Sequence, residues 1–284
     1  MSIDSSEGSP VLTPQTEVKR FKFPPPPSSF PETPAIYEIA SLPEQFTAWI
    51  VTGKGLLEND KLRKEASRAW ATAFASGVEA QRNNPIYRIP EGDEAREKIL
   101  EEELNCDSAR VVYFTLRKKQ PAEPSPQPTK PETGPTPNDE MIGIAWTLSY
   151  DNLKKINSEK AEQLRNFFPA DIFDPHKIVY ISMLGVVRQS LDGTNCSGLG
   201  LGKKMAAASV SLHPGKQTAL RTINVAAKQL YGELGFQDYQ TVNDETLNVP
   251  RSFLGMPQTN ETKPTIFVSS PLKGQKRRLG SWRS

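Results

Sequence analysis

The sequence lacks the residues on which several classes of protein depend. Among its 284 residues there are only two cysteines, Cys106 and Cys196, and two histidines, His176 and His213. Two cysteines cannot build a disulfide framework or a four-cysteine zinc site, and two histidines argue against a histidine-rich metal centre. We therefore predict no metal site.

Long apolar runs and an excess of one charge are also missing. No stretch of 18 or more apolar residues occurs, so we expect no membrane-spanning helix. Lys and Arg number 35 against 33 Asp and Glu, and the resulting net charge of +2 makes no general case for nucleic-acid binding. The first ten residues, MSIDSSEGSP, do not read as a secretory signal. We therefore expect a reduced protein of the cytoplasm or nucleus.

Proline is the one abundant residue type, and its distribution suggests the domain organisation. The chain has 25 prolines, many of them in two clusters. We expect a disordered Pro-rich segment over 1–34, one folded domain over 35–270 that is interrupted by a disordered insertion at 119–138, and a basic tail over 271–284. The Pro-rich segments are tethers or ligands for aromatic-grooved protein partners. The tail is a solvated end, a nuclear address or a phosphate-contacting patch.

Hydrophobic periodicity predicts alternating helices and strands. Helices are expected at 60–80 and 93–104, where apolar residues recur at helical spacing. Runs at 110–116 and 141–148 read as two strands of a hairpin whose turn is lengthened by the Pro-rich insertion. The remaining expected elements are a short strand at 36–39, a helix at 158–168, a central strand at 177–187, a helix at 201–212, a strand at 219–223, a helix at 226–234 and a strand at 265–268.

The segment GLGLGKK at 198–204 lies between a buried strand and a helix. Glycines let a ligand approach the backbone, and the N–H groups at a helix N-terminus suit an anion such as a phosphate. A tight turn with close packing is the alternative. The dinucleotide pattern GxGxxG fails because Met205 stands at the third glycine position, and GxxxxGK[ST] fails because Ser197 and Lys204 do not fit.

A second segment, Asn224 to Phe236, contains a motif that narrows the interpretation of the glycine loop. It matches the pattern N-x-x-A-x-x-L-Y-x-x-x-G-F, and the glycine loop partly matches R/Q-x-x-G-x-G/A at Gly200 and Gly202. In this order the two motifs make the chain resemble the GCN5-related N-acetyltransferase (GNAT) superfamily. The resemblance covers roughly residues 111–236. Ser197 stands where the family has Arg or Gln, residues 188–196 are an insertion, and Arg188 or Gln189 is a candidate for the missing side chain.

The resemblance implies an α/β fold with a mixed, mostly antiparallel sheet flanked by helices. It implies acetyl transfer from acetyl-CoA, as co-substrate, to an amine by direct attack. Tyr231 would be the general acid that protonates the departing thiolate. The residues that would bind the coenzyme are Leu184, Gly185, Val186, Ser197, Gly198, Leu199, Gly200, Leu201, Gly202, Lys203 and Asn224.

The sequence leaves the base, the acceptor and the activity itself open. No carboxylate lies on 178–187, and Tyr180 and Ser182 are the only side chains there that could relay a proton. The acceptor amine is a small molecule or a protein. The alternative function is a catalytically weak or inactive GNAT-like module that binds CoA or a protein partner.

Overall fold

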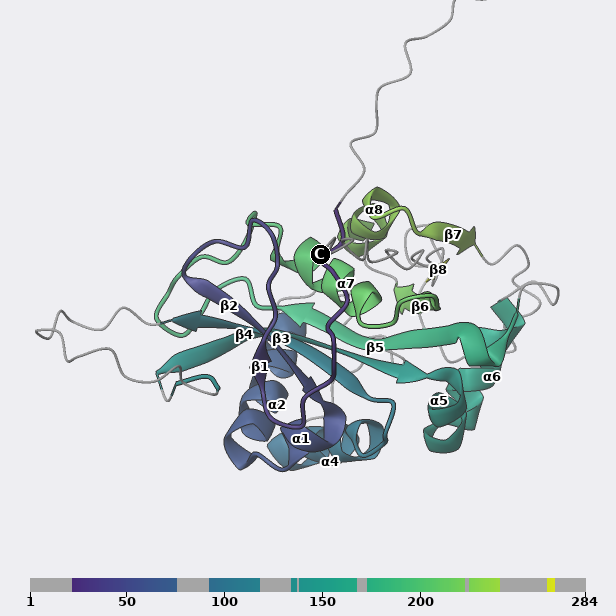
Figure 1. Cartoon of the computed structure of the whole chain (residues 1–284), viewed down its shortest axis with the longest axis horizontal. Helices are drawn as coiled ribbons and strands as arrows, with labels where there is room; N and C mark the ends of the chain where they lie inside the picture. The colour runs from purple at the N-terminus through teal and green to yellow at the C-terminus, as the bar shows by residue number, and fades with distance from the viewer. Residues whose placement is uncertain are drawn as a thin grey trace, which may run out of the picture.

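The computed structural model describes residues 22–75, 92–117, 134–136, 138–167, 173–222, 225–240 and 265–268. Its strands form one eight-stranded sheet in the order β1-β2-β3-β4-β5-β6-β8-β7 (Figure 1). The strands are β1 Ala35–Ile36, β2 Phe46–Thr52, β3 Arg110–Arg117, β4 Asp139–Ser149, β5 Ile178–Val186, β6 Gln217–Thr222, β7 Gln237–Gln240 and β8 Thr265–Val268. The helices are α1 Gly53–Leu57, α2 Asp60–Ala75, α4 Asp93–Leu104, α5 Tyr150–Ile156, α6 Ser158–Phe167, α7 Leu201–Ser211 and α8 Val225–Glu233, with a 3₁₀ turn η1 at Pro175–Lys177.

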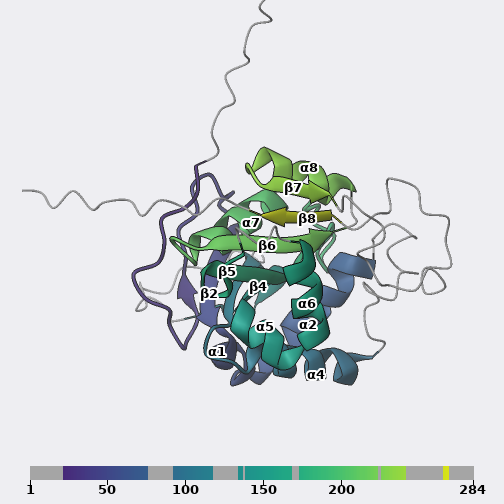
Figure 2. The same cartoon turned by 90° about the vertical axis from the view of Figure 1, so that its right-hand side faces the viewer.

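Helices cover both faces of the sheet. Figure 2 shows α7 and α8 on one side, and α1, α2, α4, α5 and α6 on the other. On the α2 side, a stripe of small and apolar residues faces the sheet, and Trp70 meets Trp146 of β4 edge to face at 5.7 Å between ring centroids. On the α7 side, Leu201, Met205 and Ala208 share a core with residues of β2, β3 and β4. Burial of these two apolar faces is the main stabilising contribution.

Every described strand pair is antiparallel except β5–β6, which is parallel. The expected mixed, mostly antiparallel sheet is therefore confirmed. The hairpin predicted across the Pro-rich insertion is also confirmed, because β3 and β4 pair from Arg110–Thr147 to Arg117–Asp139.

The β5–β6 pairing is short. It joins Ile178–Tyr180 to Gln217–Ala219, after which β5 runs on to Val186 while β6 runs on to Thr222 along β8. Within the part of the chain that the structure describes, the two strands therefore separate after Tyr180. A β-bulge lies just beyond this point, because Trp146 pairs with Met183 and Thr147 with Ile181, which leaves Ser182 as the extra residue.

The structure corrects several expectations. Strand β1 covers only Ala35–Ile36 instead of 36–39, and the sequence analysis did not predict β2, α1, α5 or β7. The predicted helix at 60–80 is described as far as Ala75, and the predicted strand at 219–223 is β6, which begins at Gln217.

The prediction of disorder over 1–34 is wrong for residues 22–34. This segment packs on the domain: the Tyr37 hydroxyl donates to the Pro25 carbonyl at 2.7 Å, and the Thr52 N–H donates to the Pro31 carbonyl at 3.0 Å. The Arg110 guanidinium lies 4.6 Å from the centroid of the Phe30 ring. Residues 1–21, most of the insertion at 119–138 and the tail at 271–284 lie outside the described residues. Among the described helices, none has the length and apolar character to cross a bilayer.

A histidine ties the end of α7 to the sheet. The Nε2 atom of His213 lies 2.7 Å from the Thr147 hydroxyl of β4. Burial, together with the nearby positive charges of Lys216 and Arg110, lowers the pKa of His213 from 6.5 to about 3. The folded protein therefore holds this imidazole neutral at pH values where the unfolded chain protonates it.

We predict that stability falls as the pH drops below about 6.5, because the unfolded state then binds a proton that the native state does not. The loss from His213 at pH 5 is at most about 2 kcal/mol. In His213→Gln, the free energy of unfolding measured by urea titration should depend less on pH between 7 and 5. The exposed His176→Gln is the matched control and should keep the wild-type pH dependence; equal slopes in all three proteins would contradict the prediction.

Candidate active site

The loop between β5 and α7 takes a backbone shape that glycine favours. Gly198 and Gly200 have φ values of +76° and +67°, and Gly200 is the N-cap of α7 in the left-handed conformation. Residues other than glycine rarely adopt these positive φ angles. The glycines therefore hold an open turn at the start of a helix.

The first turn of α7 departs from what helix stability alone favours. A helix N-terminus carries unpaired N–H groups and a partial positive charge, so an acidic residue or a polar cap normally stabilises it. Here the first turn contains no acidic residue, the cap is a glycine, and Lys203 and Lys204 stand at its end. The Lys204 ammonium donates to the Leu199 carbonyl at 3.2 Å, which keeps its charge over the loop. This arrangement is suited to an external anion.

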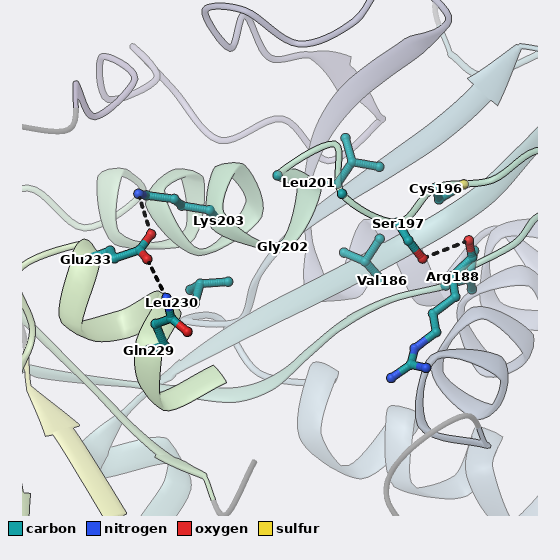
Figure 3. Close-up of a pocket in the computed structure, with 13 residues that line it drawn as sticks. Val186, Arg188, Cys196, Ser197, Leu201, Gly202, Lys203, Gln229, Leu230 and Glu233 are labelled. Atoms are coloured by element: carbon teal, nitrogen blue, oxygen red, sulfur yellow. Dashed lines mark hydrogen bonds and ion pairs between the residues drawn. The ribbon is translucent and has the colours of Figure 1, made fainter. Parts of the chain in front are cut away.

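A cavity of about 460 Å³ opens beside this loop (Figure 3). The end of β5, the glycine loop, the first turn of α7 and one side of α8 form its walls. Its lining residues are Val186, Val187, Arg188, Cys196, Ser197, Gly198, Gly200, Leu201, Gly202, Lys203, Gln229, Leu230 and Glu233. The volume suits a small organic ligand or one portion of a larger one.

Charged groups of both signs line the cavity. The Lys203 ammonium forms an ion pair of 2.9 Å with the Glu233 carboxylate of α8, which also accepts from Gln229 at 3.1 Å (Figure 3). These hydrogen bonds lower the pKa of Glu233. Glu233 thus holds Lys203 against α8, and Arg188 is a second basic residue among those that line the cavity.

Hydrogen bonds hold the insertion at 188–196 in a defined loop, and the two candidate residues Arg188 and Gln189 occupy different places in it. The backbone of Gln189 forms an isolated antiparallel β-bridge with that of Asn195, and the Gln189 side chain donates to the Gly193 carbonyl at 3.0 Å. The Leu191 N–H donates to the Glu140 carboxylate of β4, at 2.9 Å to one oxygen. Gln189 is thereby engaged within the loop, and Arg188 is the one of the two that lines the cavity.

The structure brings seven of the predicted coenzyme-binding residues together in the cavity: Val186, Ser197, Gly198, Gly200, Leu201, Gly202 and Lys203. Leu184 and Leu199 instead pack against the apolar core. Gly185 faces α2, where an added Cβ would lie 2.8 Å from the Ala73 Cβ. Asn224 lies outside the described residues. Sequence reasoning missed the α8 side of the cavity, Gln229, Leu230 and Glu233, although the helical spacing of 229, 230 and 233 could have indicated a shared face.

Tyr231 lies beside the separation of the strands, not in the cavity lining. It belongs to a buried cluster with Ile181 of β5 and Leu220 of β6, which are the first residues after the last β5–β6 pair. Its ring is 5.5 Å from that of Phe236. Burial, with a contribution from Tyr180, raises the pKa of Tyr231. The phenol therefore keeps its proton at neutral pH, as a hydrogen-bond donor must.

Comparison with known proteins identifies the fold. No family model matches the chain, and no curated protein matches it. Among solved structures, arylalkylamine N-acetyltransferase 7 from the mosquito Aedes aegypti is similar over 86% of this chain and 98% of its own, with 12% identity and a TM-score of 0.50.

Two further structures are similar at lower TM-scores. A probable acetyltransferase of the GNAT family from Chromobacterium violaceum has 10% identity over 85% of this chain and 92% of its own, with a TM-score of 0.40. Arabidopsis thaliana NAA60 in complex with acetyl-CoA has 17% identity over 67% and 92%, with a TM-score of 0.33. The fold is the one that the sequence motifs implied, that of the GNAT acetyltransferases. Among the described residues, no group of three or more His, Cys, Asp or Glu could hold a metal ion.

Gly202 gives a test of the cavity that separates binding from folding. A Cβ at this position would lie 3.5 Å from the Leu230 Cδ1, which is an ordinary contact, and its φ is not in the left-handed region. We predict that Gly202→Ala keeps or slightly raises the melting temperature, because alanine favours a helix over glycine by roughly 0.5–1 kcal/mol. The added methyl should weaken acetyl-CoA binding about tenfold or more in calorimetric titration. Gly232→Ala, on α8 outside the lining, is the matched control and should bind as the wild type does.

Proposed function

We propose that this protein is an acetyl-CoA-dependent N-acetyltransferase. One observation carries the proposal: a glycine loop that presents the N-terminus of α7 lines a cavity beside the strand that separates from its parallel neighbour. The loop would hold the diphosphate of the coenzyme through backbone N–H groups, with Lys203, Lys204 and Arg188 contributing positive charge. The free edge of β5 would hold the pantetheine arm as an added strand.

The chemistry that follows is direct transfer. The amine nitrogen attacks the thioester carbonyl carbon, the C–S bond breaks, and the thiolate takes up a proton. Backbone N–H groups at the separated edge of β5 would stabilise the oxyanion that forms. Tyr231, protonated and placed beside the separation, would supply the proton to sulfur.

The proposal is tested by binding and by turnover. Acetyl-CoA should raise the melting temperature and give a saturable heat in calorimetric titration, because a ligand of the native state stabilises it. Transfer should then be measured with acetyl-CoA and a panel containing tyramine, spermidine, and peptides that offer a free α-amine or a lysine. An arylalkylamine is included because the mosquito protein bears that name. Absence of both binding and transfer contradicts the proposal.

A non-catalytic module that binds CoA is the second candidate, and the position of Tyr231 favours it. This side chain is only 5% exposed and does not line the cavity. Binding of acetyl-CoA without transfer to any amine of the panel would select this candidate over the enzyme.

Tyr231→Phe tests the role of the phenol. If it protonates the thiolate, the variant should lose about 10²-fold in kcat with little change in acetyl-CoA affinity, because the phenyl ring keeps the packing. The matched control is Tyr113→Phe: Tyr113 is a buried tyrosine of β3 whose hydroxyl has no hydrogen-bond partner among the described residues. Equal turnover in both variants would remove Tyr231 from the mechanism.

A further inference from the structure

A carboxylate that the sequence reading did not connect with the site contacts β5. Glu103 lies in the last turn of α4, and its side chain is 14% exposed. Its Oε2 accepts from the Ser182 hydroxyl at 2.5 Å and from the Trp146 indole N–H at 2.6 Å. Its Oε1 lies 3.5 Å from the Lys160 ammonium of α6. Four elements, α4, α6, β4 and β5, therefore meet at one carboxylate.

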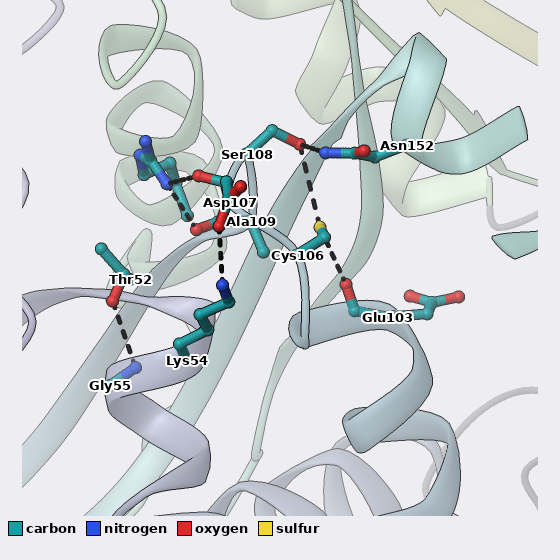
Figure 4. A network of polar contacts seen from close by, with 10 residues as sticks. Thr52, Lys54, Gly55, Glu103, Cys106, Asp107, Ser108, Ala109 and Asn152 are labelled. Atoms are coloured by element: carbon teal, nitrogen blue, oxygen red, sulfur yellow. Dashed lines mark hydrogen bonds and ion pairs between the residues drawn. The ribbon is translucent and has the colours of Figure 1, made fainter. Parts of the chain in front are cut away.

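The backbone of Glu103 is held in place by the loop that follows α4. Its carbonyl accepts from the Cys106 thiol, and Cys106 and Ser108 continue this contact to Asn152 of α5, whereas the carboxylate points away from that network (Figure 4). Contacts to the backbone carbonyl and to the carboxylate together hold Glu103 in place.

Ser182 occupies a special position on β5. It is the extra residue of the bulge, two residues beyond Tyr180, the last residue of β5 to pair with β6. It is also partly exposed, whereas the residues from Ile178 to Ile181 are buried. Val186, at the cavity, is four residues away along the strand, or about 13 Å. An extended ligand arm that enters at the cavity and follows β5 would bring its far end toward Ser182.

The cavity and the Ser182–Glu103 contact lie on different faces of the sheet. The cavity is walled by α7 and α8, whereas Glu103 and Lys160 belong to α4 and α6 on the opposite face. On that face α2 closes over Gly185, where an added Cβ would lie 2.8 Å from Ala73 and 2.9 Å from the Phe74 ring. An acceptor that approaches from the face opposite the coenzyme therefore meets β5 at Ser182.

We propose that Ser182 and Glu103 form a proton relay that deprotonates the acceptor amine; this rests on the proposed function. The Ser182 oxygen takes a proton from the ammonium of the acceptor while its own proton passes to Glu103 Oε2. The neutral amine then forms the C–N bond as the C–S bond breaks, and the proton on Glu103 leaves to solvent. Ser182 is the catalytic residue, since it touches the acceptor, and Glu103 acts through it.

The hydrogen-bond directions suit this relay. Lys160 donates to the Ser182 oxygen at 3.0 Å, so the hydroxyl proton is directed to Glu103. An alkyl hydroxyl has two lone pairs, and the second can accept from the amine. Among the described residues, the titratable groups beside the pair are Lys160 from α6, which contacts both members, and Tyr180 on β5, whose ring lies 5.1 Å from the Lys160 nitrogen; Cys106 contacts only the backbone carbonyl of Glu103. The Lys160 ammonium places a positive charge 3.5 Å from Glu103 Oε1.

The test is the pH profile of kcat/KM with acetyl-CoA and the amine of the panel that is acetylated fastest. Glu103→Gln keeps an oxygen that accepts from Ser182 and Trp146 but cannot take up a proton. We expect about 10²-fold lower kcat/KM at pH 7, with a deficit that shrinks as the pH approaches the pKa of the free amine. Ser182→Ala should show the same profile. The neighbouring, exposed Glu102→Gln is the matched control, and all variants should keep the wild-type affinity for acetyl-CoA.

The outcomes separate this relay from the proposed function. Transfer by the wild type with an unchanged profile in Glu103→Gln and Ser182→Ala overturns the relay alone. A deficit that is equal at every pH also overturns it, because a merely structural role lowers activity uniformly. If Glu103→Gln does not fold, Ser182→Ala carries the same test. Binding of acetyl-CoA with no transfer to any amine overturns the relay together with the enzymatic function.

Discussion

The end of the β5–β6 pairing at Tyr180 is the constraint on which the site depends. Strand β5 is apolar enough to lie at the centre of the sheet, yet only its first three residues pair with β6. Beyond them, no described strand pairs with this edge of β5, and under the proposed function its N–H and C=O groups would pair with the ligand, since backbone groups away from water need partners. Because β6 continues along β8 instead, the sheet stays continuous while it opens at one place. The glycine loop, the cavity and Tyr231 all lie around this opening.

The N-terminal turn of α7 is less stable locally than a well-capped helix start would be. Two glycines with positive φ, a cap without a side chain and two lysines near a positive helix end are each unfavourable for an isolated helix. Such departures from local preference are expected at functional sites. The rest of α7 offsets them, since every residue from Met205 to Ser211 is buried between the sheet and α8. Burial of the helix body thus keeps its exposed N-terminus in position for an anion.

Local patterns predicted more of this structure than long-range ones. The helix at 93–104, the β3–β4 hairpin and the glycine loop follow from periodicity and turn residues close together in the chain. The segment 22–34 was misread because its proline content suggests a solvated tether, whereas contacts of Phe30 and Pro25 with distant residues hold it on the domain. The bulge at Ser182 depends on the register between β4 and β5, which no single strand encodes. The pairing of Glu103 with Ser182 joins residues 79 positions apart, so only the fold reveals it.

The opening in the sheet also gives β5 two accessible faces, as the proposed transfer between two reactants would require. Residues on β5 alternate between the faces, and the bulge at Ser182 shifts this alternation by one, so that Ser182 contacts α4 and α6 while Leu184 and Val186 pack on the α7 side. Without the extra residue, the strand beyond the opening would present its side chains in the opposite sense. Under the proposed function, a coenzyme held from the α7 side and an amine arriving from the α4 side would meet at the same short stretch of backbone. Under the proposed function, the bulge would set the face of β5 from which the acceptor nitrogen attacks the thioester carbon, and the contacts of Ser182 with Glu103 and Lys160 hold the bulged residue in place.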